Sequence, residues 1–167
     1  VWRDWKKYMK ADEKKYFPMF VDLTQKKVTV IGAGNIAKRR IETLLSFAGT
    51  IEVIAPDACE RIKELAKEGR LVWKEKEYDR EDLYDADLVL SATNNEKVNN
   101  DVYSACKCLG ISVNTASNRM KCDFYFPSIL QKEETVIGLN SAGNPAKTKN
   151  VRKEMQKWIE EAGEKHE

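Results

Sequence analysis

The stretch VTVIGAGNIAKRR, residues 28–40, decides how the chain folds. Four β-prone residues run into two glycines one residue apart, and a basic segment of helical character follows. In the pattern Gly32-x-Gly34-x-x-Ala37 the first glycine makes a tight turn, the second lets the backbone approach a pyrophosphate, and the alanine lets the helix pack close to the strand. The alternative is a turn that only joins a strand to a helix, but this position between the two favours a dinucleotide site.

Strands and helices are expected to alternate through most of the chain. Apolar, β-branched runs predict strands, and apolar residues at helical spacing predict helices, several of which end at a glycine. The expected strands are 27–31, 50–54, 71–74, 86–91 and 111–114, and the expected helices are 35–47, 58–68 and 96–109. This alternation predicts an α/β fold with a Rossmann-like doubly wound parallel sheet.

The alternation of strands and helices ends after about residue 114. Two strands are expected at 124–126 and 134–139, with no helix between them, which predicts a small antiparallel addition. A helix over 145–161 is expected to follow.

An amphipathic helix is expected over 1–15, where Trp2, Trp5 and Met9 share one face. We therefore expect two parts in the chain. Residues 1–118 form a Rossmann NAD-binding domain with this N-terminal helical extension, and residues 119–167 form a strand-rich region with a terminal helix.

The composition excludes several classes of function. The chain is 42% hydrophobic and 34% charged, and 29 basic against 27 acidic residues leave a net charge of +2. Because basic and acidic residues nearly balance, the net charge does not indicate binding to nucleic acid or to a membrane surface. No apolar run approaches the roughly 20 residues of a spanning helix, and the charged, aromatic N-terminus does not resemble a signal peptide, so we expect a cytoplasmic protein.

The cysteines and the histidine do not form a metal-binding pattern. The four cysteines include no CxxC pair, and the one histidine, His166, lies in the polar tail. Cys106 and Cys108 lie two residues apart in an expected helix and therefore point to different faces. We expect reduced, mostly packed thiols and no metal site.

Two residues follow expected strands, at the edge where sheets of this kind bind ligands. Asp57 comes 23 residues after Gly34, where it could reach an adenosine ribose and favour NAD over NADP, or could cap the next helix. Thr93 follows the strand 86–91, where it could line the nicotinamide end of a cofactor or belong to an ordinary turn. For each residue both alternatives stay open.

Six blocks of the sequence together resemble the precorrin-2 dehydrogenase family, the NAD-dependent part of siroheme synthases. The resemblance runs from residue 16 to about residue 158 and is most specific in a CDFYFP block that follows the glycine turn. The blocks are YFPMF (16–20), AP (55–56), SAT (91–93) with Asn99, VN (113–114), CDFYFP (122–127) and SAGNP (141–145). The resemblance implies a Rossmann domain followed by a strand region through which two copies form a homodimer.

The resemblance also implies an activity, the NAD-dependent dehydrogenation of precorrin-2 to sirohydrochlorin in siroheme biosynthesis. Some members also insert ferrous iron into the product. Carried over to this sequence, the cofactor-binding residues are Gly32, Gly34, Asn35, Ile36, Pro56 and Asp57, with Thr93 near the nicotinamide. The substrate is expected near Asn114.

Two catalytic positions are implied by the same resemblance. Ser117 stands where the family usually has an Asp that acts as a general acid/base or approaches the metal, and Ser141 matches a serine near the substrate. A serine hydroxyl cannot accept a proton near neutral pH as a carboxylate does, nor supply charge to attract iron. This weakens the expectation of ferrochelatase activity more than that of dehydrogenase activity. Ser141 could instead belong to the turn before the last helix, for which Asn144 is the expected N-cap and Pro145 the first residue.

Cationic side chains are expected to hold the substrate, because precorrin-2 carries several carboxylates. The basic residues around the strand addition and the last helix are Arg119, Lys121, Lys147, Lys149 and Arg152. Arg119 and Lys147 are the substrate-binding candidates among them, although each cation alone is more typical of a solvated surface.

Two other interpretations remain open. Ser117 also suits a non-catalytic protein that binds a tetrapyrrole or NAD without turnover. The glycine turn alone also suits a Rossmann module that senses the redox state of NAD through a partner. Many family members carry a further helical domain, and since this chain ends at Glu167, one wall of the tetrapyrrole cleft is expected to be either missing or supplied by another protein.

Overall fold

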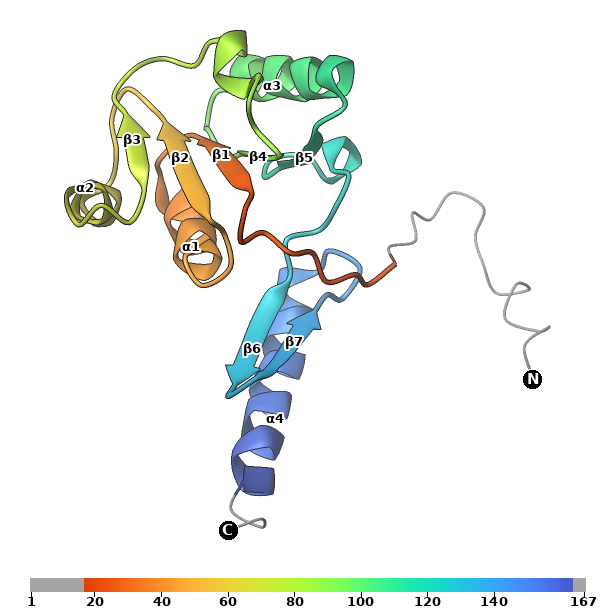
Figure 1. The fold of residues 1–167 in the computed structure, drawn as a ribbon. Coiled ribbons are helices and arrows are strands. Elements are labelled where there is room, and N and C mark those ends of the chain that lie inside the picture. Colours follow the sequence, from red (N-terminus) through yellow and green to blue (C-terminus); the bar gives the residue numbers. More distant parts are fainter. Residues whose placement is uncertain (1–16, 164–167) are drawn as a thin grey trace, which may run out of the picture.

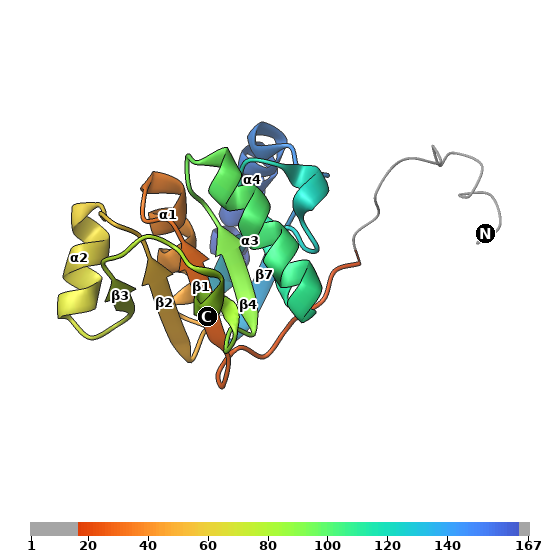
Figure 2. The same ribbon diagram turned by 90° about the horizontal axis from the view of Figure 1, so that it is seen from above.

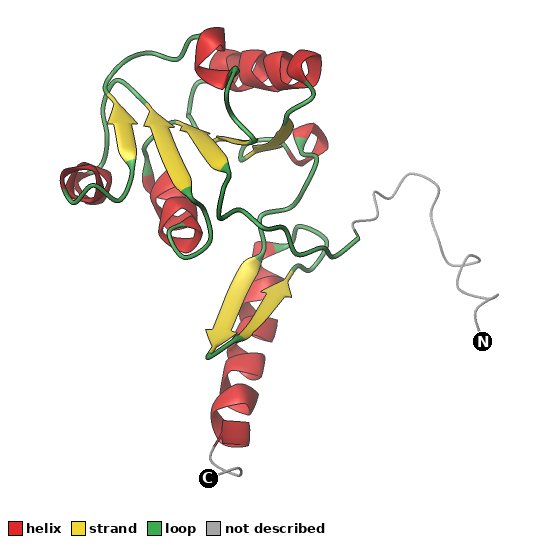
Figure 3. Ribbon diagram, in the orientation of Figure 1, coloured by secondary structure: helices red, strands yellow, loops and turns green. Residues whose placement is uncertain are grey.

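The computed structural model describes residues 17–163, so the helix expected over 1–15 lies outside the described residues. The chain forms a five-stranded sheet with helices on both faces, followed by a two-stranded sheet and a long helix (Figure 1, Figure 3). The strands are β1 Lys27–Ile31, β2 Thr50–Ile54, β3 Val72–Lys74, β4 Leu88–Ser91, β5 Ser112–Thr115, β6 Ser128–Lys132 and β7 Thr135–Leu139. The α-helices are α1 Asn35–Leu44, α2 Glu60–Lys67, α3 Glu96–Leu109 and α4 Pro145–Gly163, and short 3₁₀ helices span Arg80–Leu83 and Arg119–Lys121.

The larger sheet is parallel throughout, in the order β3-β2-β1-β4-β5. β1 is central because its short, mostly β-branched side chains are buried on both faces, as a strand between two parallel neighbours requires. From β1 the chain steps outward through β2 to β3, then returns to β4 on the other side of β1 and continues to β5. This reversal creates a topological switch point between β1 and β4, and it confirms the predicted doubly wound α/β fold.

The helices lie on opposite faces of the sheet, with α3 on the face toward the viewer in Figure 2. Two apolar layers of side chains hold them there. Alternate residues of β1 face opposite ways: Val30 belongs to the layer with α1 and α2, and Ile31 to the layer with α3. In the first layer, Ile41 of α1 and Ile62 of α2 are fully buried. The packing of α1 fixes its first turn against the end of β1, where the glycine turn lies.

The C-terminal part extends away from the five-stranded sheet (Figure 1). β6 and β7 pair as an antiparallel hairpin, and α4 packs along β6. Asn144 caps α4 by accepting a hydrogen bond from the Lys147 N–H (3.1 Å), and Pro145 is the first helical residue, so the predicted cap is confirmed. A two-stranded hairpin is marginally stable alone in water, so the hairpin depends on α4 and on its other contacts.

The strand predicted at 124–126 is wrong, because the hairpin begins only at Ser128. Phe124 and Phe126 instead pack against the core layer that contains α1 and α2. The carbonyl of Phe124 accepts a hydrogen bond from Nδ2 of Asn114 (2.6 Å), which ties this segment to β5. The alternating aromatic pattern therefore reflects packing on the parallel domain and not strand pairing. The other predicted strands and helices within residues 17–163 are present, with ends that differ by a few residues.

Candidate active site

Backbone hydrogen bonds gather the carboxyl ends of β1, β2 and β4 at one edge of the sheet. The N–H of Gly32, just after β1, donates to the Ile54 carbonyl at the end of β2 (2.9 Å). The N–H of Ala92, just after β4, donates to the Ile31 carbonyl at the end of β1 (2.8 Å). The glycine turn therefore lies at the switch point, where open parallel sheets bind their ligands.

The two glycines of the turn are required for different reasons. Gly32 has a φ of +102°, and a Cβ added there would lie 2.7 Å from the backbone oxygen of Ala92. Neither the torsion nor the space admits a side chain at Gly32. Gly34 has an ordinary φ of −83°, and an added Cβ would meet no heavy atom of the described residues within 4 Å. Since internal packing does not require Gly34, the open space above it is what fits a pyrophosphate that approaches the backbone.

The first turn of α1 offers unsatisfied donors beside this space. Asn35 and Ile36 begin the helix, and none of the described side chains caps its N-terminal N–H groups. No acidic residue lies in this turn, so the positive end of the helix dipole is available to an anion. Ile36 is 46% exposed, whereas Ala37 is fully buried, as close packing between helix and strand requires.

The loop after β2 lies beside the glycine turn. The N–H of Cys59 donates to the carbonyl of Ala33, which is the residue between the two glycines (3.1 Å). Pro56 and Asp57 are exposed in this loop, at the carboxyl end of β2. The structure therefore brings these two predicted cofactor residues next to the turn.

The Asp57 carboxylate is paired with a lysine and does not cap α2. Its Oδ1 lies 2.9 Å from Nζ of Lys63, and this hydrogen bond, together with one from the Ala58 N–H, holds the pKa of Asp57 below its usual value. The N-cap of α2 is Cys59, so the alternative assignment of Asp57 as the helix cap is wrong. Ala58 and Cys59 follow Asp57 before the first helical residue, Glu60.

Thr93 and Ser117 are brought together by a residue that the sequence analysis did not assign, Asn99 of α3. Nδ2 of Asn99 donates to the Thr93 carbonyl (3.0 Å) and to Oγ of Ser117 (3.3 Å). Ser117 is exposed in the turn after β5. Asn99 is only 2% exposed and shares the buried face of α3 with Val102 and Cys106. A polar residue at i, i+3, i+7 spacing with buried apolar residues is the signal that could have found it.

Asn114 joins β5 to the segment that leads to the hairpin. It is 3% exposed, and its Nδ2 holds the Phe124 carbonyl as described above. Nearby, the Asp123 carboxylate accepts from the Val113 N–H (3.0 Å) and pairs with Lys107 of α3. The role of Asn114 in substrate binding stays a prediction.

Arg119 and the loop that carries Ser141 form a second group. Nη1 of Arg119 lies 3.4 Å from the carbonyls of Ala142 and Gly143. A Cβ added at Gly143 would lie 3.0 Å from the Arg119 side chain, so the two pack closely. Ser141 is half-buried at the start of this loop, and Lys147 is exposed in the first turn of α4. Arg119 is thus engaged by the loop, and its contact with substrate stays a prediction.

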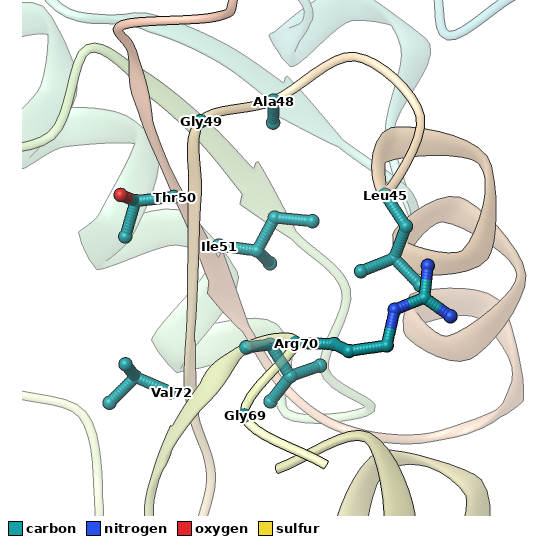
Figure 4. A pocket seen from close by; sticks show the side chains of 9 residues that line it. Leu45, Ala48, Gly49, Thr50, Ile51, Gly69, Arg70 and Val72 are labelled. Carbon is teal, nitrogen blue, oxygen red and sulfur yellow. The ribbon is translucent and has the colours of Figure 1, made fainter.

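A separate hollow of about 360 Å³ opens at the opposite edge of the sheet, at the amino ends of β2 and β3 (Figure 4). Its lining residues are Leu45, Ala48, Gly49, Thr50, Ile51, Gly69, Arg70, Leu71 and Val72. Because the candidate site lies at the carboxyl ends of the strands, this hollow at their amino ends does not belong to it.

Within residues 17–163, no group of three or more His, Cys, Asp or Glu side chains is arranged to hold a metal ion. None of the four cysteines, all of which lie in the described residues, forms a disulfide: Cys106 and Cys122 are buried, Cys59 is half-buried and Cys108 is exposed. In this same part of the chain, no helix combines the length and the apolar character needed to cross a bilayer.

Comparisons with known proteins agree with this geometry. The family described as putative NAD(P)-binding matches residues 19–128, which contain the whole parallel sheet and the site residues up to Ser117. A solved structure of SirC, a precorrin-2 dehydrogenase, superposes with a TM-score of 0.69 at 26% identity, covering 85% of this chain and 70% of that one.

Curated relatives of the chain are proteins of siroheme biosynthesis. The siroheme synthase of Pseudoalteromonas atlantica is 35% identical over 145 residues, which is 86% of this chain and 31% of that protein. A probable multifunctional siroheme biosynthesis protein of Ruminiclostridium josui is 37% identical over 143 residues, covering 84% of this chain and 28% of that one. The chain spans less than a third of the length of these two relatives. It belongs to the precorrin-2 dehydrogenase family, and it carries an NAD(P)-binding domain.

Proposed function

We propose that the chain binds NAD at the glycine turn and oxidises precorrin-2 to sirohydrochlorin in siroheme biosynthesis. The reaction removes two hydrogens from the substrate, one as a hydride that bound NAD accepts and one as a proton. The observation that carries the proposal is the open space over Gly34 at the switch point, beside the uncapped start of α1. The precorrin-2 dehydrogenase and siroheme synthases that the chain resembles support the choice of substrate.

The residues at this edge have distinct roles in the proposal. The N–H groups at Asn35 and Ile36 hold the pyrophosphate, and the Asp57 carboxylate binds the adenosine ribose. Thr93 bounds the nicotinamide end, and Ser117 faces the substrate from the turn after β5. Arg119 and Lys147 supply positive charge for the carboxylates of precorrin-2, and Ser141 and Asn114 line the same cleft.

We further propose that the chain works in the cytoplasm as a homodimer, with residues 1–118 as the nucleotide-binding part and 119–167 as the dimerisation part. The support comes from side chains that a second copy would cover. Trp158 on α4 is 64% exposed, and in the segment before β1 Phe17 is 87% and Phe20 is 79% exposed. A second copy that covered these side chains would remove their apolar surface from water.

A second candidate function rests on Ser117. A hydroxyl at this position suits a protein that binds a tetrapyrrole or NAD without turnover, because no carboxylate stands there to accept the proton. This candidate predicts binding of sirohydrochlorin and NAD but no formation of NADH.

Formation of NADH from precorrin-2 and NAD, followed by absorbance, tests the proposal. We expect NADH to form with the wild-type chain and Gly34→Ala to raise the Kd for NAD by at least about tenfold, because the added methyl fills the pyrophosphate space. The stability of this variant should stay within about 1 kcal/mol of wild type, because its φ is ordinary and nothing crowds it. Tight binding of both ligands without NADH would favour the second candidate, and unchanged NAD affinity in Gly34→Ala would contradict the assigned cofactor site.

Asp57 is expected to decide between NAD and NADP. Its carboxylate accepts from a ribose 2′-OH but repels a 2′-phosphate, and the hydrogen bond from Lys63 lowers the pKa of this carboxylate further below neutral pH. In Asp57→Ala this repulsion is gone and Lys63 is left unpaired, so the ratio of the Kd values for NAD and NADP should move toward NADP by about tenfold or more.

Fluorescence titration with each nucleotide measures this change. The double variant Asp57→Ala, Lys63→Met is the matched control, and it should lose most of the gain in NADP affinity because the free ammonium is absent. An unchanged preference in Asp57→Ala would mean that the carboxylate does not reach the ribose.

A further inference from the structure

Asn99 is a buried amide that uses its whole hydrogen-bonding capacity at the carboxyl edge of the sheet. Its Oδ1 lies 2.7 Å from Oγ of Ser91 and 3.1 Å from Oγ1 of Thr93. Its Nδ2 lies 3.0 Å from the Thr93 carbonyl and 3.3 Å from Oγ of Ser117. One side chain of α3 therefore joins the end of β4 to the turn after β5.

The partners of Asn99 fix the direction of each hydrogen bond. The Thr93 carbonyl can only accept, so the amide nitrogen must face it, and the same nitrogen faces Ser117. The amide oxygen can only accept, so the Ser91 hydroxyl donates to it. Oγ of Ser117 thus receives a hydrogen bond through a lone pair, and its own proton remains for another acceptor.

Thr93 differs from Ser117 in this respect. Its hydroxyl proton is committed inside the turn, where the Asn95 carbonyl (3.0 Å) and Oδ1 of Asn99 (3.1 Å) are its acceptors. Its lone pair accepts from the Asn95 N–H (3.0 Å). Ser117 is exposed, and among these three hydroxyls it is the one whose proton is not directed to Asn99 or its turn.

We propose that Asn99 is a positioning residue for the reaction, because it holds Ser117 as an acceptor and so presents the Ser117 proton to the substrate. The proposal rests on the proposed function for the identity of that substrate, a polycarboxylated tetrapyrrole. Ser117 acts in it as a hydrogen-bond donor to a carboxylate of the tetrapyrrole, and not as a base. Asn99 itself does not touch the substrate.

Binding of sirohydrochlorin, measured by absorbance titration, tests the link between the two residues. Ser117→Ala should weaken binding by about fivefold to tenfold, because one hydrogen bond to a charged group is lost. Asn99→Ala removes the donor toward Ser117 without adding a charge, so the Ser117 hydroxyl is no longer held as an acceptor and binding weakens by a similar factor. The double variant should be no weaker than the worse single one, because both changes remove the same contact.

Ser104→Ala is the matched control, since it removes an exposed hydroxyl of α3 that contacts only the Asn100 carbonyl in the described chain. It should leave sirohydrochlorin binding unchanged. Losses that add in the double variant would overturn the proposal and leave Asn99 with a purely structural role.

A second measurement needs neither substrate nor cofactor. In Ser117→Asp, the introduced carboxylate would accept a hydrogen bond from Nδ2 of Asn99. This hydrogen bond should lower the pKa of the introduced carboxyl by about one unit below that of an unperturbed aspartate, as measured by ¹³C NMR titration. Adding Asn99→Ala should raise that pKa again by about the same amount. An unchanged pKa would overturn the proposal, whereas failure to form NADH would contradict only the proposed function, so the two failures are distinguishable. If Asn99→Ala does not fold, Asn99→Ser, which keeps a hydroxyl too short to reach Ser117, replaces it in this titration.

Discussion

Replacing Gly32 by alanine is expected to lower the free energy of unfolding by about 3 kcal/mol and to abolish measurable NAD binding. Two costs combine at this position. The φ of +102° disfavours any L side chain, and the added Cβ would lie 2.7 Å from the Ala92 oxygen, which is backbone and cannot rotate away. The turn must shift to relieve the contact, and this moves the start of α1 away from the phosphate position. Urea denaturation and calorimetric titration with NAD measure the two effects.

Gly110→Ala is the matched control for the torsion alone. Gly110 ends α3 with a φ of +71°, but an added Cβ there meets no heavy atom of the described chain within 4 Å. We expect this variant to lose only about 1 kcal/mol and to bind NAD normally. If Gly32→Ala resembled Gly110→Ala in both measurements, the close approach of the β1 and β4 ends would have no role in cofactor binding.

The parallel domain could be predicted from sequence because its signals are local. The β-branched run before Gly32 and the glycine that follows it each act within a few residues, and the strand, the turn and the start of α1 lie where they were expected. The aromatic segment at 124–126 has an equally strong local pattern but a different use. Phe124 and Phe126 pack, half-buried, against the core layer that contains α1 and α2, which are far away in the sequence, so no local periodicity could distinguish packing from strand pairing.

The candidate site was predictable only where the backbone builds it. The glycine turn needs a particular torsion and a particular space, and both restrict the residue type. Asn99 has no such restriction, because its role depends on Ser91, Thr93 and Ser117 meeting at one edge after folding. The contact of Arg119 with the Gly143 carbonyl is likewise non-local, and the sequence alone suggested either a substrate-binding cation or a solvated one.

The Ser117→Asp variant is expected to oxidise precorrin-2 about 10-fold to 100-fold faster than the wild-type chain. Oxidation releases a proton, and a serine hydroxyl cannot accept it near neutral pH, whereas a carboxylate can. The position is already built for an anion, because Nδ2 of Asn99 lies 3.3 Å from the side-chain oxygen and would donate to a carboxylate as well. The introduced carboxylate also repels the substrate carboxylate that Ser117 would bind, so the KM for precorrin-2 should rise while kcat increases. The rate of NADH formation at saturating NAD and saturating precorrin-2 measures the gain.

Ser117→Asn is the control for this gain, since it has nearly the same size as aspartate but no basic oxygen, and it should show no acceleration. The pH profile gives the sharper test. The added rate should require the ionised carboxylate, so it should be present above the pKa of the introduced group and disappear as the pH falls through it. The wild-type rate should lack that limb. Equal rates in Ser117→Asp and Ser117→Asn would show that proton acceptance at this position does not limit the reaction, and the chain would then have to release the proton directly to water.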